Sequence, residues 1–197
     1  MKLIKLLLMV FTITSTMLLF GCGSTENNST KNDYAGIWYA INEQGGIDKI
    51  TLEKQGESYL VSYKKYFFQY PDIFDNGTYN KNNLTENLIP VRLATKNPID
   101  KKAITIKNNI LELPYEDYKC TLTFKNNKLI GKPDEDYKEE LIFEKHSVNE
   151  SKTIYTKAKE TFVKYISTRE KYPLNKEDLK FTPNKYLKDE FKDYDKF

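Results

Sequence analysis

The sequence predicts a mainly β protein of the α+β class, in which an antiparallel meander forms a barrel or a strongly curved sheet and a C-terminal amphipathic helix follows it. Three observations predict this fold. Between residues 34 and 146, apolar and polar residues alternate in runs of four to nine, which is the period of strands covered on one face. Turn signals separate these runs. After His146 the apolar residues recur every three or four positions, as they do along a helix covered on one side.

Eight strands are expected, followed or preceded by short turns. They span residues 36–41, 48–54, 58–66, 88–95, 103–107, 110–113, 118–124 and 137–145. The second and third should form a hairpin, because Gly56 supplies the positive φ of a tight turn. Asn108–Asn109 and Asn126–Asn127 both lie between alternating runs, and asparagine tolerates the left-handed conformation that type I′ turns require. Residues 71–87 form a polar, irregular insert.

A near repeat at a spacing of 19 residues, 114–124 and 133–143, predicts which faces of two strands are covered. Side chains alternate between faces along a strand, so Cys120 shares a core face with Leu122 and Phe124. In the second copy Glu139 occupies the position of Cys120. We expect Glu139 to be exposed rather than placed at a barrel mouth, because an unpaired buried carboxylate is costly.

The helix should begin at the sequence Ser147–Val–Asn–Glu150, which has the form of a capping box. It is expected over residues 149–171 and should stop before Pro173, with two shorter helical pieces at 176–180 and 184–191. Its apolar stripe should pack on the β part and cover Trp38 or its neighbours. A partner-binding or membrane-surface helix is the alternative.

The N-terminal residues indicate export. Lys2 and Lys5 precede an apolar run over residues 6–20, which is shorter than the roughly 20 residues of a spanning helix. The run closes in Leu19–Phe20–Gly21–Cys22, which resembles the lipobox of bacterial lipoproteins. That resemblance implies that Cys22 is acylated, as in palmitate-bearing lipoproteins, and becomes the first residue of the mature chain. An ordinary cleaved signal peptide with an incidental cysteine, or an uncleaved anchor, is the alternative.

These signals divide the chain into four parts. Residues 1–21 are the signal peptide, 22–33 a flexible polar tether, 34–146 the β domain and 147–197 the helical C-terminal segment. The expected location is the cell membrane, with the folded part lipid-anchored on the extracytoplasmic side. The abundance of Asn, Lys, Ile and Tyr is typical of a genome rich in A and T, which favours a Gram-positive bacterium.

Charge and residue counts exclude several functions. Without Lys2 and Lys5 the 31 basic residues fall to 29, against 28 acidic ones, and this balance argues against nucleic-acid binding. One histidine, His146, and one cysteine beyond Cys22 cannot supply a zinc site or a disulfide. The acidic run 134–136 is interpreted as a solvated turn. We therefore predict no catalytic residue, metal or cofactor, and a carboxylate-based hydrolase is the remaining enzymatic alternative.

Gly36–Ile37–Trp38, in the first strand of a meander that ends in a helix, resembles the lipocalin (calycin) group. The resemblance implies that Trp38 plugs the closed end of a barrel and that an arginine packs on it, for which Arg169 is the one late candidate. A tryptophan that simply anchors a β core is the alternative.

Two functions are then expected, and both are non-enzymatic. The first is a lipocalin-like site for a small apolar ligand, lined by Trp38, Tyr59, Val61, Tyr63, Val91 and Leu93. The second is a surface interaction, inhibitor or immunity protein that contacts a partner through loops 71–87 and 133–138.

Overall fold

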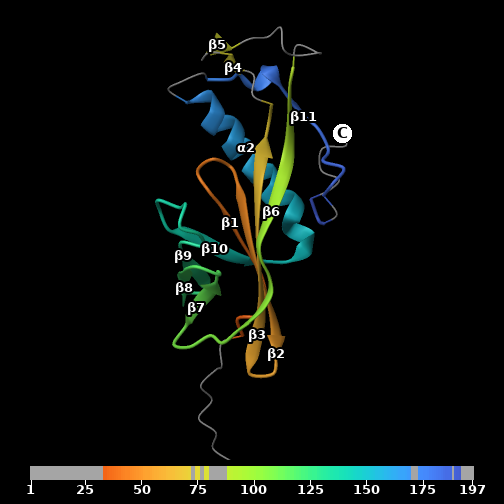
Figure 1. Cartoon of the computed structure of the whole chain (residues 1–197). Coiled ribbons are helices and arrows are strands. Elements are labelled where there is room, and N and C mark those ends of the chain that lie inside the picture. Colours follow the sequence, from red (N-terminus) through yellow and green to blue (C-terminus); the bar gives the residue numbers. More distant parts are fainter. Residues whose placement is uncertain are drawn as a thin grey trace, which may run out of the picture. The chain divides into compact units, whose positions relative to one another are not determined.

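The computed structural model describes residues 33–71, 74–75, 78–79, 88–169, 173–187 and 189–191. The predicted signal peptide and Cys22 lie outside these residues. From Tyr34 onward the chain forms one compact unit. It is mainly β, with one helix near its C-terminal end, as the sequence predicted (Figure 1).

Nine strands form one sheet, and the order across it is β11-β6-β3-β2-β1-β10-β9-β8-β7. The strands are β1 (Gly36–Ile41), β2 (Ile47–Gln55), β3 (Ser58–Gln69), β6 (Ile89–Ile104), β7 (Ile110–Pro114), β8 (Lys119–Lys125), β9 (Lys128–Gly131), β10 (Leu141–His146) and β11 (Leu179–Phe181). Two further short strands, β4 (Phe74–Asp75) and β5 (Thr78–Tyr79), pair with each other. All pairs are antiparallel except β6 with β11.

The strand order is that of an up-and-down meander with one open seam. Each of β1, β2, β3 and β6 pairs with the next, β7 to β10 do the same, and β10 returns to pair with β1. β6 and β7 follow each other in the chain but are not neighbours in the sheet. Between them, one isolated antiparallel bridge pairs Lys107, in the connecting turn, with Ile110, the first residue of β7. The sheet is therefore curved and not closed.

Half of the predicted strands are found within one residue of their expected bounds, and the larger differences concern four strands. The run 88–95 and the first two residues of the run 103–107 belong to one strand, β6, which continues through Pro98 and ends at Ile104. Register shifts against β3 accompany this segment, and proline is tolerated in a strand where the ladder is interrupted. β9 was not predicted as a strand, β3 continues to Gln69, and β10 begins at Leu141 instead of 137. Glu139 is exposed, as expected.

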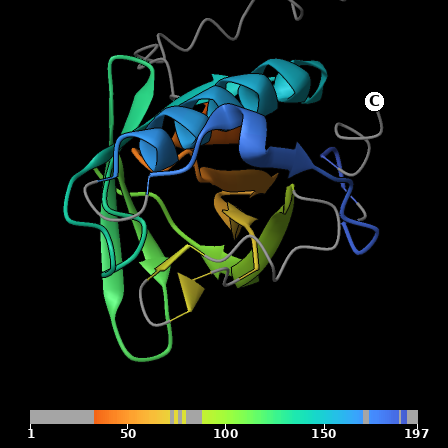
Figure 2. The same cartoon turned by 90° about the horizontal axis from the view of Figure 1, so that it is seen from above.

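The covered face of the sheet changes along the long strands. In β3, Val61 and Tyr63 are buried on one face, whereas Tyr66 and Phe68 are buried on the other. We call the part around the β2–β3 turn, where β7 to β10 curl over the first face, the barrel-like half. The part where the helix covers the opposite face is the helix half (Figures 1 and 2).

The core of the barrel-like half draws on all eight strands of the meander. Its buried residues are Trp38, Ala40, Ile50, Leu52, Tyr59, Val61, Tyr63, Ile99, Leu111, Leu113, Cys120, Leu122, Leu129 and Phe143. Trp38 is 4% exposed, and its Nε1 donates to the carbonyl of Tyr34 at 3.1 Å. The cation above the indole is Lys145, with Nζ 5.7 Å from the ring centroid. Arg169 does not take that place, because it donates to the hydroxyl of Tyr70 at 2.8 Å.

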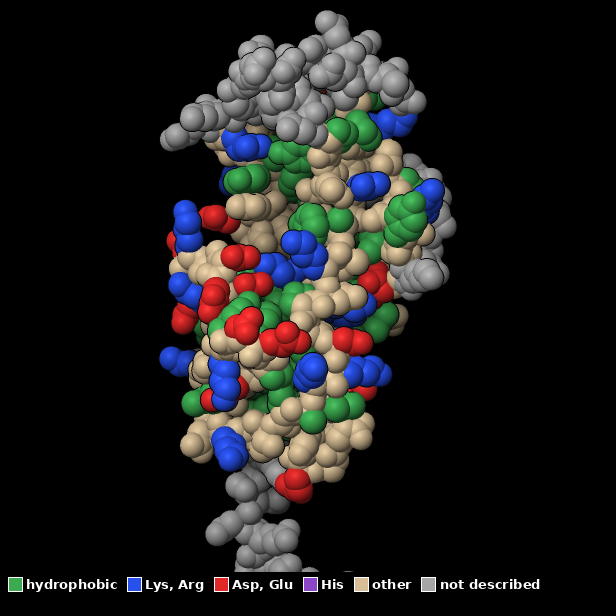
Figure 3. Space-filling view, viewed as in Figure 1, with side chains coloured by type: hydrophobic (Ala, Val, Ile, Leu, Met, Phe, Trp, Pro, Cys, Tyr) green, Lys and Arg blue, Asp and Glu red, His purple; other side chains and the backbone are tan. Residues whose placement is uncertain are grey.

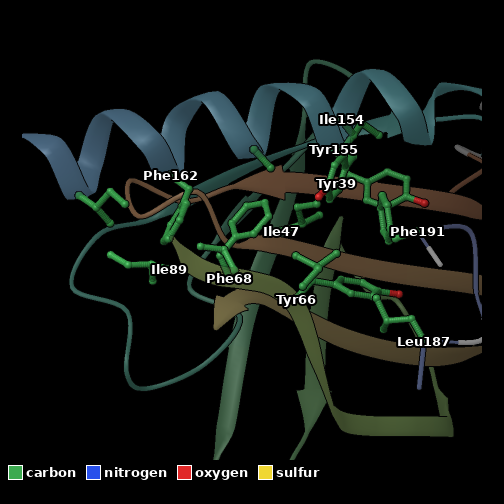
Figure 4. Packing of buried hydrophobic residues seen from close by; sticks show 14 of the residues in the cluster. Tyr39, Ile47, Tyr66, Phe68, Ile89, Ile154, Tyr155, Phe162, Leu187 and Phe191 are labelled. Atoms are coloured by element: carbon green, nitrogen blue, oxygen red, sulfur yellow. The ribbon is translucent and has the colours of Figure 1, made fainter. Parts of the chain in front are cut away.

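The helix half is covered by α2 (Ser151–Ser167). Its stripe of Ile154, Ala158, Phe162 and Ile166 is buried against Tyr39, Ile47, Phe68 and their neighbours, as predicted (Figure 4). A short 3-10 turn, η2 (Val148–Glu150), precedes α2. There the Glu150 carboxylate accepts hydrogen bonds from the N–H and hydroxyl of Ser147 at 2.7 and 2.8 Å. The helix covers Tyr39, the neighbour of Trp38, and not Trp38 itself, since the two point to opposite faces.

The loop between β1 and β2 passes close beneath α2. Gly45 has a φ of +79°, and a Cβ added there would lie 2.5 Å from the backbone nitrogen of Phe162. A side chain at this position would therefore push the helix away from the sheet.

The C-terminal segment is only partly helical. The predicted helical piece 176–180 is a 3-10 turn, η3 (Lys176–Asp178), followed by the start of strand β11. The described residues of the other predicted piece, 184–191, form turns and no helix. Leu187 and Phe191 are buried in the core of the helix half. The reason for the difference is tertiary, because β11 forms by pairing with β6 and has too short a pattern to be recognised alone.

Two acidic residues of this segment balance the positive charges of two neighbouring lysines on the sheet. Lys49 and Lys64 are direct cross-strand partners, and like charges in that position repel each other. Lys49 lies 2.5 Å from Glu190, and Lys64 lies 3.6 Å from Asp189. Burial acts to raise the pKa of Glu190, but hydrogen bonds from Lys49 and Tyr39 and the charge of Lys49 outweigh it and lower the pKa.

Candidate ligand-binding site

The six residues expected to line a ligand cavity do not come together. Trp38, Tyr59, Val61 and Tyr63 belong to the core of the barrel-like half. Val91 and Leu93 belong to the core of the helix half, on the opposite face of the sheet. Strand alternation identifies the two faces of β6 correctly, but it does not reveal that the covered face changes between the two halves.

The first four of these side chains are packed against their neighbours. Their exposed fractions run from 0% for Val61 and Tyr63 to 8% for Tyr59. Tyr63 is not purely apolar in its contacts, because its hydroxyl donates to Asp48 at 2.5 Å. The interior of the barrel-like half is thus a core with one buried polar group at its edge.

Asp48 is that buried polar group, with 1% of its surface exposed. It accepts hydrogen bonds from the hydroxyls of Tyr63 and Tyr137, the latter at 2.7 and 2.6 Å from its two oxygens. Asn42 lies 3.5 Å away. Burial raises the pKa of Asp48, although these hydrogen bonds and the charge of Lys65 act to lower it. Its acceptor positions are occupied, so we regard it as a structural carboxylate that holds Tyr137 in place.

The loop that carries Tyr137 is bound to the sheet at further points. Asp134 lies 3.2 Å from the ammonium of Lys65, and the hydroxyl of Tyr118 donates to Asp134 at 3.4 Å. Lys65 also lies 4.8 Å from the ring centroid of Tyr137. The interpretation of 134–136 as a solvated turn therefore holds for Glu135 and Asp136, which are exposed, and not for Asp134.

A pocket lies at the far end of β3, in the helix half. Its volume is about 370 Å³, and it is lined by Gln69, Tyr70, Pro71, Pro90, Arg92 and Thr182. These residues come from the end of β3, the start of β6 and the chain just after β11. Thr182 is held there because its N–H donates to the carbonyl of Val91 at 2.8 Å.

The pocket lies at an edge of the sheet: Tyr70 packs against the core of the helix half, with its ring centroid 6.1 Å from that of Phe162, whereas Gln69 and Arg92 lie on the face that α2 does not cover. Phe68 and Leu93 are cross-strand partners that point into the core of the helix half. Their neighbours Gln69 and Arg92, also partners, therefore point to the other face. Figure 3 shows Lys and Arg side chains spread over one face of the molecule from top to bottom, with most Asp and Glu side chains gathered around its middle.

Arginine is the distinctive residue of this region. The chain has two arginines; Arg92 lines the pocket, and Arg169 hydrogen-bonds the pocket residue Tyr70. Arg92 donates to the side-chain oxygen of Gln69 at 3.3 Å. No lining residue is acidic, and within the described part of the chain neither arginine forms an ion pair.

Sequence reasoning did not identify this pocket. The arginines lie 77 positions apart in the sequence, and one wall depends on β11 (Leu179–Phe181), a strand that the sequence did not predict and that overlaps the expected helical piece 176–180. The rarity of arginine among the basic residues was the one signal that could have drawn attention to Arg92.

Among the described residues, no group of three or more His, Cys, Asp and Glu side chains is arranged to hold a metal ion. In the same part of the chain, no helix has the length and apolar character needed to cross a membrane. No family model, curated protein or solved structure matches the chain. The function is therefore inferred from the pocket and from the sequence signals.

Proposed function

We propose that the protein is a lipid-anchored, extracytoplasmic binding protein that holds a small ligand in the pocket between β3, β6 and the residues after β11, without catalysis. The sequence alone placed such a ligand inside the β domain. We move it to the pocket because the interior residues Tyr59, Val61 and Tyr63 are at most 8% exposed.

The observation that carries this proposal is the pocket itself. Its volume of about 370 Å³ lies within the range of small-molecule sites, which are commonly about 300–1,000 Å³ and mostly apolar with a few polar groups. The rings of Tyr70, Pro71 and Pro90 supply apolar surface, and Arg92, Gln69 and Thr182 supply polar atoms. This composition is typical of a site that binds one ligand in a defined orientation.

The anchor is supported by the sequence. Lys2, Lys5 and the apolar run 6–20 have the order of an export signal, and Cys22 follows directly. A cysteine that carries more than one acyl chain is enough for stable attachment to a membrane. The polar residues 23–33 would then separate the folded unit from the bilayer surface.

Native mass spectrometry of the protein purified from its own cells tests the proposal. We expect an added mass beyond the lipid anchor, and its loss in Gln69→Trp, because Gln69 is exposed, lines the pocket and can carry an indole into it without disturbing a core. Lys96→Trp is the matched control, since Lys96 is exposed on the neighbouring strand and does not line the pocket. Retention of the same mass in Gln69→Trp would place the ligand elsewhere, and a wild-type protein without any added mass would remove the support for a ligand.

A second candidate function is binding of a protein partner through loop 133–138. The observation in its favour is that Asp134 and Tyr137 fix this loop to the sheet while Glu135 and Asp136 remain exposed. A loop that is already ordered loses little conformational freedom on binding. Much of the other loop of this hypothesis, 71–87, lies outside the described residues.

Photo-cross-linking on intact cells distinguishes this second candidate. A cross-linking amino acid at Asp136 should give a discrete adduct, whereas the same group at Lys54, an exposed position at the β2–β3 turn, should not. Equal adducts at both positions would argue against a specific role for the loop.

A further inference from the structure

We infer that the pocket takes an organic carboxylate, in which Arg92 binds the carboxylate group and the proline and tyrosine rings contact an apolar body. This inference rests on the proposed ligand-binding function and specifies the chemical class of the ligand. Four features of the described residues support it.

The first feature is a guanidinium that forms no ion pair with a carboxylate among the described residues. Arg92 lines the pocket and donates a hydrogen bond to the neutral side chain of Gln69 at 3.3 Å. A guanidinium has five N–H donors, so most of them are left for solvent or a ligand. Its planar, forked geometry matches a carboxylate, which it can bind through two parallel hydrogen bonds.

The second feature is a phenol whose oxygen is already engaged by a cation. The hydroxyl of Tyr70 accepts a hydrogen bond from Arg169 at 2.8 Å. Since that oxygen acts as an acceptor toward Arg169, its hydrogen is left to be donated. Tyr70 also lines the pocket, and a cation at its oxygen makes the phenol a stronger donor to an anion.

The third feature is the charge of the surrounding surface. On the same face as Arg92, Lys96 lies over the ring of Phe67, with Nζ 5.9 Å from the centroid. Its cross-strand partner is another cation, Lys65. The charge of Lys65 is balanced by Asp134 at 3.2 Å, whereas Lys96 has no carboxylate partner among the described residues. The approach to the pocket is therefore basic, which favours the entry of an anion.

The fourth feature is the apolar part of the lining. Pro71 and Pro90 have no backbone N–H and present ring surfaces, and Tyr70 adds an aromatic ring. These groups offer little to a fully hydrophilic anion such as inorganic phosphate. They suit a hydrocarbon or aromatic body attached to the carboxylate.

A matched pair of probes tests this inference. The full-length protein is placed in zwitterionic lipid nanodiscs and titrated, by ¹⁹F NMR, with 4-(4-fluorophenyl)butyrate and with the corresponding neutral butanamide. The two probes share shape and apolar body and differ in charge. Empty nanodiscs measure partition into lipid, and the measurement is repeated for Arg92→Gln, Arg92→Lys and Lys96→Gln.

We expect the acid to bind at least tenfold more tightly than the amide. Arg92→Gln should lower the affinity for the acid by roughly tenfold to a hundredfold, because it removes charge-assisted hydrogen bonds worth about 1.5–3 kcal/mol. The same change should leave the amide unaffected. Lys96→Gln removes one positive charge from the same face and should change the affinity of the acid by less than about threefold, as expected for a screened surface charge. Arg92→Lys should lie between wild type and Arg92→Gln, because a lysine keeps the charge and loses the fork.

The inference would be overturned by equal affinity for the acid and the amide, by no effect of Arg92→Gln on binding of the acid, or by an effect of Lys96→Gln as large as that of Arg92→Gln. Failure of both probes to bind would also overturn it. That failure is distinguishable from failure of the proposed function, because the native-mass experiment on Gln69→Trp reports whether the pocket holds a ligand of any class. Thermal unfolding of each variant, expected to match wild type since Arg92 and Lys96 are exposed, excludes loss of folding as the cause.

Discussion

Neutralising Glu190 should destabilise the helix half, because it removes the counter-charge of a lysine that is nearly buried. The side chains of Lys49 and Glu190 are 12% and 11% exposed, and their charged atoms lie 2.5 Å apart. In Glu190→Gln, the ammonium of Lys49 would face its cross-strand partner Lys64 with only Asp189 nearby.

The magnitude follows from the burial of the pair. Removal of one partner from a fully buried ion pair costs about 3–5 kcal/mol. Here some water reaches both groups, and the amide oxygen of glutamine can still accept hydrogen bonds from Lys49 and Tyr39. We therefore expect Glu190→Gln to lower the free energy of unfolding by about 2–3 kcal/mol. With a urea m-value of about 2 kcal/mol/M, the midpoint should fall by about 1 M.

Urea unfolding followed by the fluorescence of Trp38 measures this shift. Glu53→Gln is the matched control, because Glu53 lies 3.9 Å from Lys101 in a pair whose side chains are 45% and 63% exposed, and such pairs contribute at most about 1 kcal/mol. Adding Lys49→Gln to Glu190→Gln should recover part of the loss, since it removes the uncompensated ammonium. Equal midpoints for Glu190→Gln and Glu53→Gln would refute the reasoning.

The pH dependence provides a second check. The pKa of Glu190 is lowered in the folded protein, so its contribution is present above the pKa of an unfolded glutamate, about 4.3, and is lost as the pH falls through the folded pKa. The difference in stability between wild type and Glu190→Gln should therefore be constant near neutral pH and shrink below about pH 4. A difference that grows on acidification would contradict this.

Three further predictions concern the two cysteines and the tryptophan. Cys22→Ser should leave an unprocessed precursor or release the protein from the membrane fraction, and metabolic labelling with a fatty acid should no longer mark it; continued labelling would show that the anchor lies elsewhere. Cys120 is 7% exposed, and its burial, together with the charges of Asp134 and Glu135, raises the pKa of its thiol. A thiol reagent should therefore react slowly with Cys120 until urea is added. Fast reaction in the native state would be inconsistent with a buried Cys120. Trp38→Ala should cost about 3–5 kcal/mol, and a wild-type emission maximum typical of solvent-exposed indole would rule out the burial on which that figure depends.

The local pattern of the sequence determined most of the secondary structure. The Asn–Asn turns are an example, because Asn108, Asn109, Asn126 and Asn127 all have positive φ, between 52° and 62°, as type I′ turns require. The capping box at Ser147 and the buried stripe of α2 are others. Each of these features depends on residues within a few positions of one another, and for that reason they can be recognised without knowledge of the fold.

The tertiary structure decided which face of each strand is covered, and with it the position of the candidate site. Val61 and Leu93 have equivalent alternating patterns, yet they are buried on opposite faces, because β7 to β10 cover one end of the sheet and α2 covers the other. The pocket beside Arg92 needs the parallel strand β11, whose three residues pair with a strand about 90 positions earlier. Alternation reveals that a strand has two faces, but the element that covers either face is contributed by distant parts of the chain, and no local pattern encodes that choice.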